Sequence, residues 1–222
     1  TGTIAVGKSF VAEKLVERVR EKGQQAHHLN IDQLIRDVYA EDSAGAQMMR
    51  EAMADILGDE VLTEHRNDVN RGVLAKKLFA KDCPQELREQ IQDLTGPHVM
   101  RKYREFLNGK KGLIVLEWAQ LAEMRVSNWT NHHVIVVDSP DKEAFASMRG
   151  IEAERLTELA KVQRTAEEKV KAIEIEMSND HHGLVLCYQN HLRYDVEEAK
   201  SDLEPLVDQV TELFTTLFSE PQ

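Results

Sequence analysis

Cysteine is scarce in this sequence. Cys83 and Cys187 are its two cysteines, and they lie far apart. A disulfide framework like that of small secreted domains is therefore excluded, and a reducing compartment is favoured. No apolar run reaches the roughly 20 residues that a membrane-spanning helix needs, and no signal peptide is visible. We therefore expect a cytoplasmic protein with no membrane partner.

Positive charge is also in short supply. The chain has 28 Lys and Arg residues against 39 Asp and Glu residues, a formal net charge of −11. This balance argues against a protein that coats nucleic acid through bulk electrostatics, although it leaves room for a locally basic pocket. The 222 residues are enough for one α/β domain with insertions and short for two. We expect a single domain over 1–222, and its oligomeric state stays open.

Glycine is sparse too, yet two glycines stand in an informative motif near the start of the chain. The stretch from Gly2 to Ser9 satisfies G-x-x-x-x-G-K-[ST], the pattern of a phosphate-binding loop. In such a loop, backbone N–H groups face the phosphates of a nucleotide, Lys8 reaches the β- and γ-phosphates, and Ser9 offers its hydroxyl to Mg²⁺. The predicted nucleotide-binding residues are Gly2, Thr3, Ile4, Ala5, Val6, Gly7, Lys8, Ser9 and Phe10.

The residues around the motif agree with this interpretation. Val11, Leu15 and Val19 recur every four residues and predict a helix from about Lys8, ended by Gly23. Its N-terminus would direct a positive dipole end at the bound anion. A buried strand normally precedes such a loop, so we expect the first strand upstream of residue 1. The alternative is a glycine-rich turn before an ordinary surface helix.

An acidic residue follows the next predicted strand. Residues 25–31 favour a short strand, which places Asp32 at or just past its C-terminal end. Ligands of open α/β sheets bind at that edge. Asp32 there can accept the proton of a substrate hydroxyl while ATP donates its γ-phosphoryl group. A helix N-cap is the other interpretation, and one residue can fill both roles.

The middle of the chain is helical in pattern. Residues 44–108 predict a helical acceptor-binding subdomain, with breaks near Gly58, around Asn67 and at Pro84 and Pro97. Arg71 starts one amphipathic segment of it. By itself, that arginine is most simply a solvated helix charge.

Two apolar runs and a charged helical region follow. Residues 112–118 predict a central parallel strand buried on both faces, and Glu117 at its exit is placed to hold Mg²⁺, directly or through water. Residues 133–138 predict a second buried strand. Residues 142–177 favour helices that form a lid over ATP, with Arg149 among their cations, or else a solvated helical hairpin.

The last segments predict structure rather than chemistry. Residues 183–188 favour a final strand, and Leu206, Val210, Leu213, Phe214 and Leu217 recur at helical spacing as core. Three adjacent histidine pairs, at 27–28, 132–133 and 181–182, do not have the spacing of a metal site, because neighbours in a strand point to opposite faces.

Taken together, these motifs resemble the dephospho-CoA kinase family over nearly the whole chain. The phosphate loop matches, residues 29–32 are similar to the family's strand ending in D-x-D, and residues 71–79 resemble its R-x-x-L…F segment. Residues 117–123 resemble D-x-P-L-L-F-E, with Glu123 kept and Ala119 in place of the proline. Residues 136–140 match V-V-D-x-P. The family's lid arginine and later glutamine correspond to Arg149 and Gln163.

The sequence also departs from the family's pattern. Gly96-Pro97 stands in place of its His-Pro, its Q-x-x-R is absent, residues 177–183 are an extra segment, and only Asn190 stands for its terminal asparagine. Donor-side residues are thus better kept than acceptor-side residues.

The resemblance implies a P-loop kinase fold of three layers, α/β/α, with a parallel sheet, a helical substrate subdomain and a helical lid at 142–177. It implies transfer of a phosphate from ATP, with Mg²⁺, to the ribose 3′-hydroxyl of dephospho-CoA. Lys8, Asp32 and Arg149 would then be catalytic, and Asp32, Arg71, Glu123 and Gln163 would bind substrate. Two alternatives stay open: a related kinase for another nucleoside-like acceptor, and a nucleotide-binding regulatory module without turnover.

Overall fold

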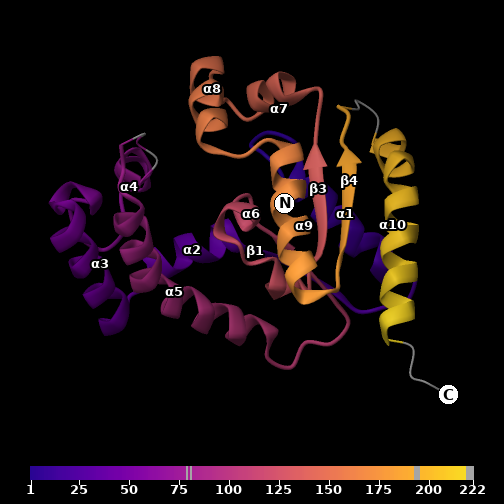
Figure 1. The fold of residues 1–222 in the computed structure, drawn as a ribbon, viewed down its shortest axis with the longest axis horizontal. Coiled ribbons are helices and arrows are strands. Elements are labelled where there is room, and N and C mark those ends of the chain that lie inside the picture. The colour runs from indigo at the N-terminus through magenta and orange to yellow at the C-terminus, as the bar shows by residue number, and fades with distance from the viewer. Residues whose placement is uncertain (79, 81, 193–195, 219–222) are drawn as a thin grey trace. The chain divides into compact units, whose positions relative to one another are not determined.

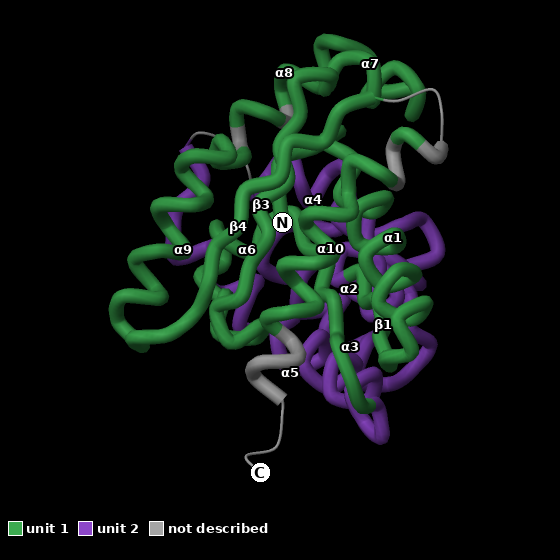
Figure 2. The backbone as a smooth tube through the Cα atoms, turned by 90° about the vertical axis from the view of Figure 1, so that its right-hand side faces the viewer, with its two compact units in different colours: residues 1–30, 111–222 green, residues 31–110 purple. Residues whose placement is uncertain are grey.

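The structure is a computed structural model and describes residues 1–78, 80, 82–192 and 196–218. The chain divides into two compact units, residues 1–30 with 111–222 and residues 31–110 (Figure 2). Among the residues described, no helix is both long and apolar enough to span a bilayer.

The first unit contains the strands. Its elements in chain order are α1 (Lys8–Glu21), β1 (Ala26–Asn30), β2 (Leu113–Glu117), α6 (Leu121–Met124), the 3₁₀ turn η2 (Ser127–Thr130), β3 (His133–Asp138), α7 (Lys142–Met148), α8 (Ala153–Val162), α9 (Ala166–Asp180), β4 (Leu184–Gln189) and α10 (Val196–Phe218) (Figure 1).

Both strand pairs of the described residues are parallel. β1 pairs with β2 and β3 pairs with β4, with Asn30 opposite Glu117 and Asp138 opposite Gln189. The chain start adds to the second pair, because the Val137 N–H donates to the Thr1 carbonyl at 2.8 Å. The predicted α/β class with parallel strands is confirmed. Parallel pairing also brings the C-terminal ends of paired strands to one edge, where site residues gather.

Helices cover both faces of the β3–β4 pair. α1 and α10 share a core with alternate strand residues, among them Ile135 and Val137. Because successive strand side chains point to opposite faces, Val134 and Val136 face the other way, and α9 packs against β3 and β4 with Ile173 fully buried. Figure 1 shows α9 in front of β3. Val11, Leu15 and Val19 are buried as the helical pattern predicted.

Two predictions about the first unit concern the burial of β2 and of α10. Residues 113–116 of β2 are half-buried, so the prediction of a strand buried on both faces was wrong. The physical reason is that β2 has a strand partner on one edge within the described residues, β1. In α10, Leu206 and Val210 are buried, while the side chains of Phe214 and Leu217 lie outside the described residues.

The second unit is helical. It contains α2 (Ile31–Tyr39), α3 (Ala44–Leu57), the 3₁₀ turn η1 (Asp59–Val61), α4 (Arg71–Leu78) and α5 (Gln85–Leu107). The predicted break at Pro97 was wrong, because α5 continues through that residue. Proline removes one backbone donor and crowds the preceding turn, but a helix of 23 residues keeps the rest of its bonds, and Thr95 and Val99 bury its inner face around the proline. Phe79 lies outside the described residues.

Candidate active site

Both fixed glycines of the motif are required by packing. A Cβ on Gly2 would lie 2.2 Å from the Val137 carbonyl oxygen, and a Cβ on Gly7 would lie 2.2 Å from the Asn190 amide nitrogen. Gly7 also has a positive φ of 77° and sits at the N-cap of α1 without a side-chain cap. The loop thus leads directly into an N-terminus whose orphan N–H groups favour an anion.

Two distant side chains hold the loop. The Ile4 N–H donates to Gln163 Oε1 at 2.9 Å, and Asn190 Nδ2 donates to the Val6 carbonyl at 2.9 Å. These contacts bracket Ala5, whose φ of 57° is in the left-handed region that side-chain-bearing residues rarely adopt. Lys8 Nζ donates to the Thr3 carbonyl at 2.7 Å, which keeps the ammonium folded back over its own loop.

The two residues predicted to hold a metal meet at the end of β2. Ser9 Oγ donates to Glu117 Oε1 at 2.7 Å, although the residues are 108 positions apart. The other oxygen, Oε2, accepts from Asn30 Nδ2 at 2.9 Å and lies 3.1 Å from His28 Nε2. His28 and Asn30 reach it because β1 lies beside β2 in register. Neither was singled out from the sequence as a partner of Glu117.

The surroundings of Glu117 favour its ionised form. Burial raises the pKa of this carboxyl, but hydrogen bonds from His28 and Ser9, together with the charges of His28 and Lys8, outweigh that effect and lower the pKa below its ordinary value. Its side chain is nevertheless only 6% exposed. The site therefore contains a buried carboxylate beside a hydroxyl and close to a lysine.

Glu123 is fully engaged by other protein groups. Its Oε1 accepts the Arg164 N–H at 2.9 Å and Lys169 Nζ at 2.6 Å, and its Oε2 accepts Lys169 Nζ at 2.7 Å. Lys169 lies in the region predicted as a helical lid, residues 142–177, and the sequence analysis did not single it out or predict this pairing. A helical cation gives no signal in the sequence that distinguishes a buried lysine from a solvated one.

The remaining predicted residues lie in several places. Phe10 is partly buried and packs its side chain against the core of the first unit. Arg149 is an exposed residue at the C-cap of α7. Asp32 and Arg71 belong to the second unit. Asp32 lies in the first turn of α2 and Arg71 begins α4, so Asp32 is inside its helix rather than at the N-cap position.

One histidine forms a buried network away from the loop. His132, just before β3, places Nδ1 2.6 Å from Ser127 Oγ and Nε2 2.7 Å from Asp180 Oδ2, and Ser127 Oγ donates to Glu176 at 2.7 Å. Its partners come from η2 and α9, which spacing within the sequence did not indicate. Among the described residues, no group of three or more His, Cys, Asp or Glu side chains is arranged to hold a metal ion.

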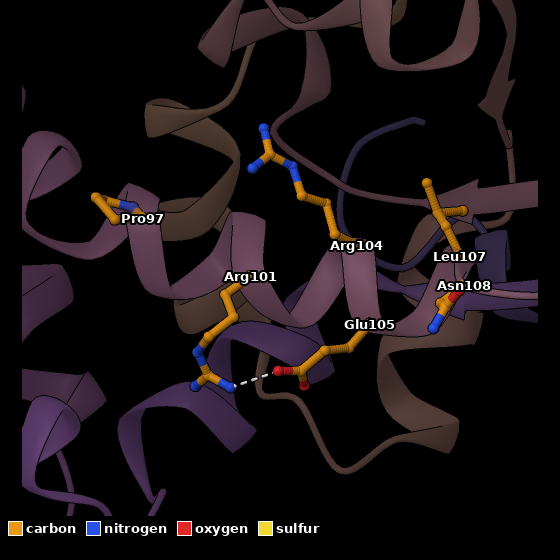
Figure 3. A pocket seen from close by; sticks show the side chains of 6 residues that line it. All are labelled: Pro97, Arg101, Arg104, Glu105, Leu107 and Asn108. Atoms are coloured by element: carbon orange, nitrogen blue, oxygen red, sulfur yellow. Dashed lines mark hydrogen bonds and ion pairs between the residues drawn. The ribbon is translucent and has the colours of Figure 1, made fainter.

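A hollow of about 570 Å³ lies along α5, lined by Pro97, Arg101, Arg104, Glu105, Leu107 and Asn108 (Figure 3). Arg101 pairs with Glu105 at 2.8 Å and with Glu41 at 2.7 Å. None of the predicted site residues lines this hollow.

Solved structures and a family model match this chain. A crystal structure of TT1252 from Thermus thermophilus is similar at 20% identity, with a TM-score of 0.63 and coverage of 94% of each chain. A dephospho-CoA kinase from Campylobacter jejuni matches at 13% identity and a TM-score of 0.46, over 96% of this chain and 95% of that one. The first likeness supports the fold. A family model described as dephospho-CoA kinase matches residues 1–183. The chain therefore belongs to the dephospho-CoA kinase family.

Proposed function

We propose that the protein transfers the γ-phosphoryl group of ATP to the ribose 3′-hydroxyl of dephospho-CoA, giving CoA and ADP. The observation that carries this proposal is a complete phosphate loop in a chain of the dephospho-CoA kinase family, with Ser9 of the loop hydrogen-bonded to Glu117.

The loop from Gly2 to Phe10 holds the phosphates of ATP through its backbone N–H groups and the N-terminus of α1. Lys8 releases the Thr3 carbonyl and moves to the β- and γ-phosphates, a short movement because its ammonium already lies over the loop. Arg149, on an exposed turn, adds a second cation to the transferring group.

Asp32 accepts the proton of the acceptor hydroxyl as the oxygen bonds to the γ-phosphorus and the bond from phosphorus to ADP breaks. Arg71 binds dephospho-CoA on the acceptor side. Glu123 and Gln163 close the site around it, Glu123 through its contacts with Lys169 and Arg164. This set is proposed from the family motifs at these positions.

The residues at the end of β2 fit Mg²⁺. Ser9 and Glu117 offer a hydroxyl and a carboxylate, the oxygen ligands that this ion prefers. Bound there with ATP, Mg²⁺ would neutralise charge on the β- and γ-phosphates. The low pKa of Glu117 keeps that carboxylate ionised at neutral pH.

An acceptor panel tests the proposal. Purified protein with MgATP is offered dephospho-CoA, nucleosides, nucleotides or no acceptor, and ADP release is measured together with the phosphorylated product. Release that depends on dephospho-CoA supports the proposal. Turnover with another acceptor would replace it by a related kinase, and binding of ATP without turnover on any acceptor would replace it by a regulatory module.

A further inference from the structure

Lys169 is the largest fully buried side chain of the described residues, with 0% exposed. Its ammonium donates to both oxygens of Glu123, at 2.6 and 2.7 Å, and to the Ala119 carbonyl at 2.8 Å. These three acceptors match the three N–H groups of a lysine. Because burial of a charge offsets much of its attraction to a partner, such a pair is weak evidence for stability. A role in placement accounts for it better.

The pair fixes the segment between α8 and α9. Lys169 is on α9, and its partner Glu123 is on α6. The same carboxylate accepts the Arg164 N–H at 2.9 Å, and the Arg164 guanidinium donates to the Ala122 carbonyl at 3.1 Å. Arg164 therefore has its backbone and its side chain both held against α6.

Gln163 is the neighbour of Arg164, and its side chain is the one that accepts the Ile4 N–H of the phosphate loop. A second route leads from Lys169 to the loop, because the Ala119 carbonyl also accepts Thr1 Oγ1 at 3.2 Å. The buried ion pair is thus connected to the first half of the loop by short, directional contacts on both sides.

We propose that Lys169 is a positioning residue for nucleotide binding, which acts through Glu123 and Arg164 to place Gln163 on the phosphate loop. This inference rests on the proposed function only in so far as the loop binds a nucleotide. It assigns Glu123 the task of an anchor for the α8–α9 segment. Placement of Gln163 keeps Ile4 and the left-handed Ala5 in the shape that receives phosphate, which lowers the cost of ordering the loop on binding.

The test measures binding of MgATP without acceptor by calorimetry, with the full chain. Lys169→Met is expected to weaken binding about fivefold to tenfold, the usual worth of one such hydrogen bond. Gln163→Ala is expected to do the same. Lys171→Met is the matched control, since Lys171 is an exposed lysine on the same helix, and it should bind as tightly as the wild type.

The double variant Lys169→Met with Gln163→Ala separates positioning from a general structural effect. If Lys169 acts through Gln163, the double variant binds MgATP no more weakly than whichever single variant has the lower affinity. Independent effects would multiply to roughly 25-fold or more and would overturn the inference. In turnover with dephospho-CoA, Lys169→Met should raise the KM for ATP while kcat stays within about twofold.

A wild type that does not bind MgATP would refute the proposed function. A wild type that binds it, alongside Lys169→Met of equal affinity, would refute this inference alone. If Lys169→Met does not fold, the double variant Lys169→Met with Glu123→Gln takes the place of Lys169→Met in the same measurements. It leaves no buried charge unpaired. Wild-type affinity for MgATP in this double variant would equally overturn the inference.

Discussion

The hydroxyl of Ser9, at the start of α1, donates a 2.7 Å hydrogen bond to Glu117 at the end of β2. A helix N-terminus and a strand C-terminus thereby meet at the edge where ligands of parallel sheets bind. This contact joins the phosphate loop to the acidic end of the neighbouring strand pair, and the first prediction follows from it.

Removal of either oxygen ligand should raise the Mg²⁺ requirement. We expect Ser9→Ala and Glu117→Gln each to increase the Mg²⁺ concentration for half-maximal turnover by about tenfold, because each removes one ligand or its charge. The measurement is ADP release at fixed ATP over a Mg²⁺ titration. Asn30→Ala, which removes a donor to Glu117 but no proposed metal ligand, should shift the curve less. Equal curves for wild type and Glu117→Gln would contradict the metal role.

Asp32→Asn tests the general base. The variant should slow phosphoryl transfer by roughly 10²–10⁴ and leave MgATP affinity nearly unchanged, since an amide cannot accept the proton of the hydroxyl. Rapid-quench kinetics with saturating substrates measure the chemical step, and calorimetry measures affinity. Turnover at the wild-type rate would reduce Asp32 to a residue of the first turn of α2.

Gly7→Ala tests the close packing between the loop and Asn190. Gly7 and Gly23 both have a φ near 80°, at 77° and 81°, but a Cβ on Gly23 meets nothing within 4 Å. Gly23→Ala should therefore cost only the backbone strain, about 1–2 kcal/mol of unfolding free energy. Gly7→Ala should cost about 1–3 kcal/mol more, because the Asn190 amide is pushed from the Val6 carbonyl.

Urea unfolding of both glycine variants gives the comparison. Asn190→Ala in the Gly7→Ala background removes the colliding amide and should recover part of the difference. Equal losses for Gly7→Ala and Gly23→Ala would show that Asn190 is not in contact with the loop.

The depressed pKa of Glu117 predicts a pH dependence of stability. Its folded pKa is lower than its unfolded pKa, which is about 4.3, so the contribution of this carboxylate is fully present above pH 4.3. It is lost as the pH falls through the folded pKa. The difference in unfolding free energy between wild type and Glu117→Gln should thus be constant from pH 7 to about pH 5 and shrink below about pH 4.

Urea unfolding at several pH values measures this difference. His28→Gln, which removes one of the groups that lower the pKa, should make the loss smaller and complete it at a higher pH. A difference that grows towards acid pH would mean that the Glu117 pKa is raised rather than lowered.

Local patterns account for much of the fold. The spacing of Val11, Leu15 and Val19 predicted α1, and the apolar run from His133 to Asp138 predicted β3 with the bounds observed. The same rules went wrong at Pro97, where a long helix tolerates the proline, and at β2, where exposure depends on strand neighbours. A local sequence pattern does not show which strands will lie beside β2.

The candidate site also has a part that the sequence predicted and a part that only the structure revealed. A phosphate loop is recognisable from sequence because its functional residues, here the two glycines, Lys8 and Ser9, lie in one short continuous motif. The sequence by itself determined that loop, the parallel α/β class and the family. Only the tertiary structure decided which of many similar side chains meet it: Glu117 at Ser9, Asn190 at Val6, and Lys169 rather than Lys171 inside the protein. The reason is that burial and hydrogen bonding depend on contacts between residues 46 to 184 positions apart, which packing creates and no short sequence pattern contains.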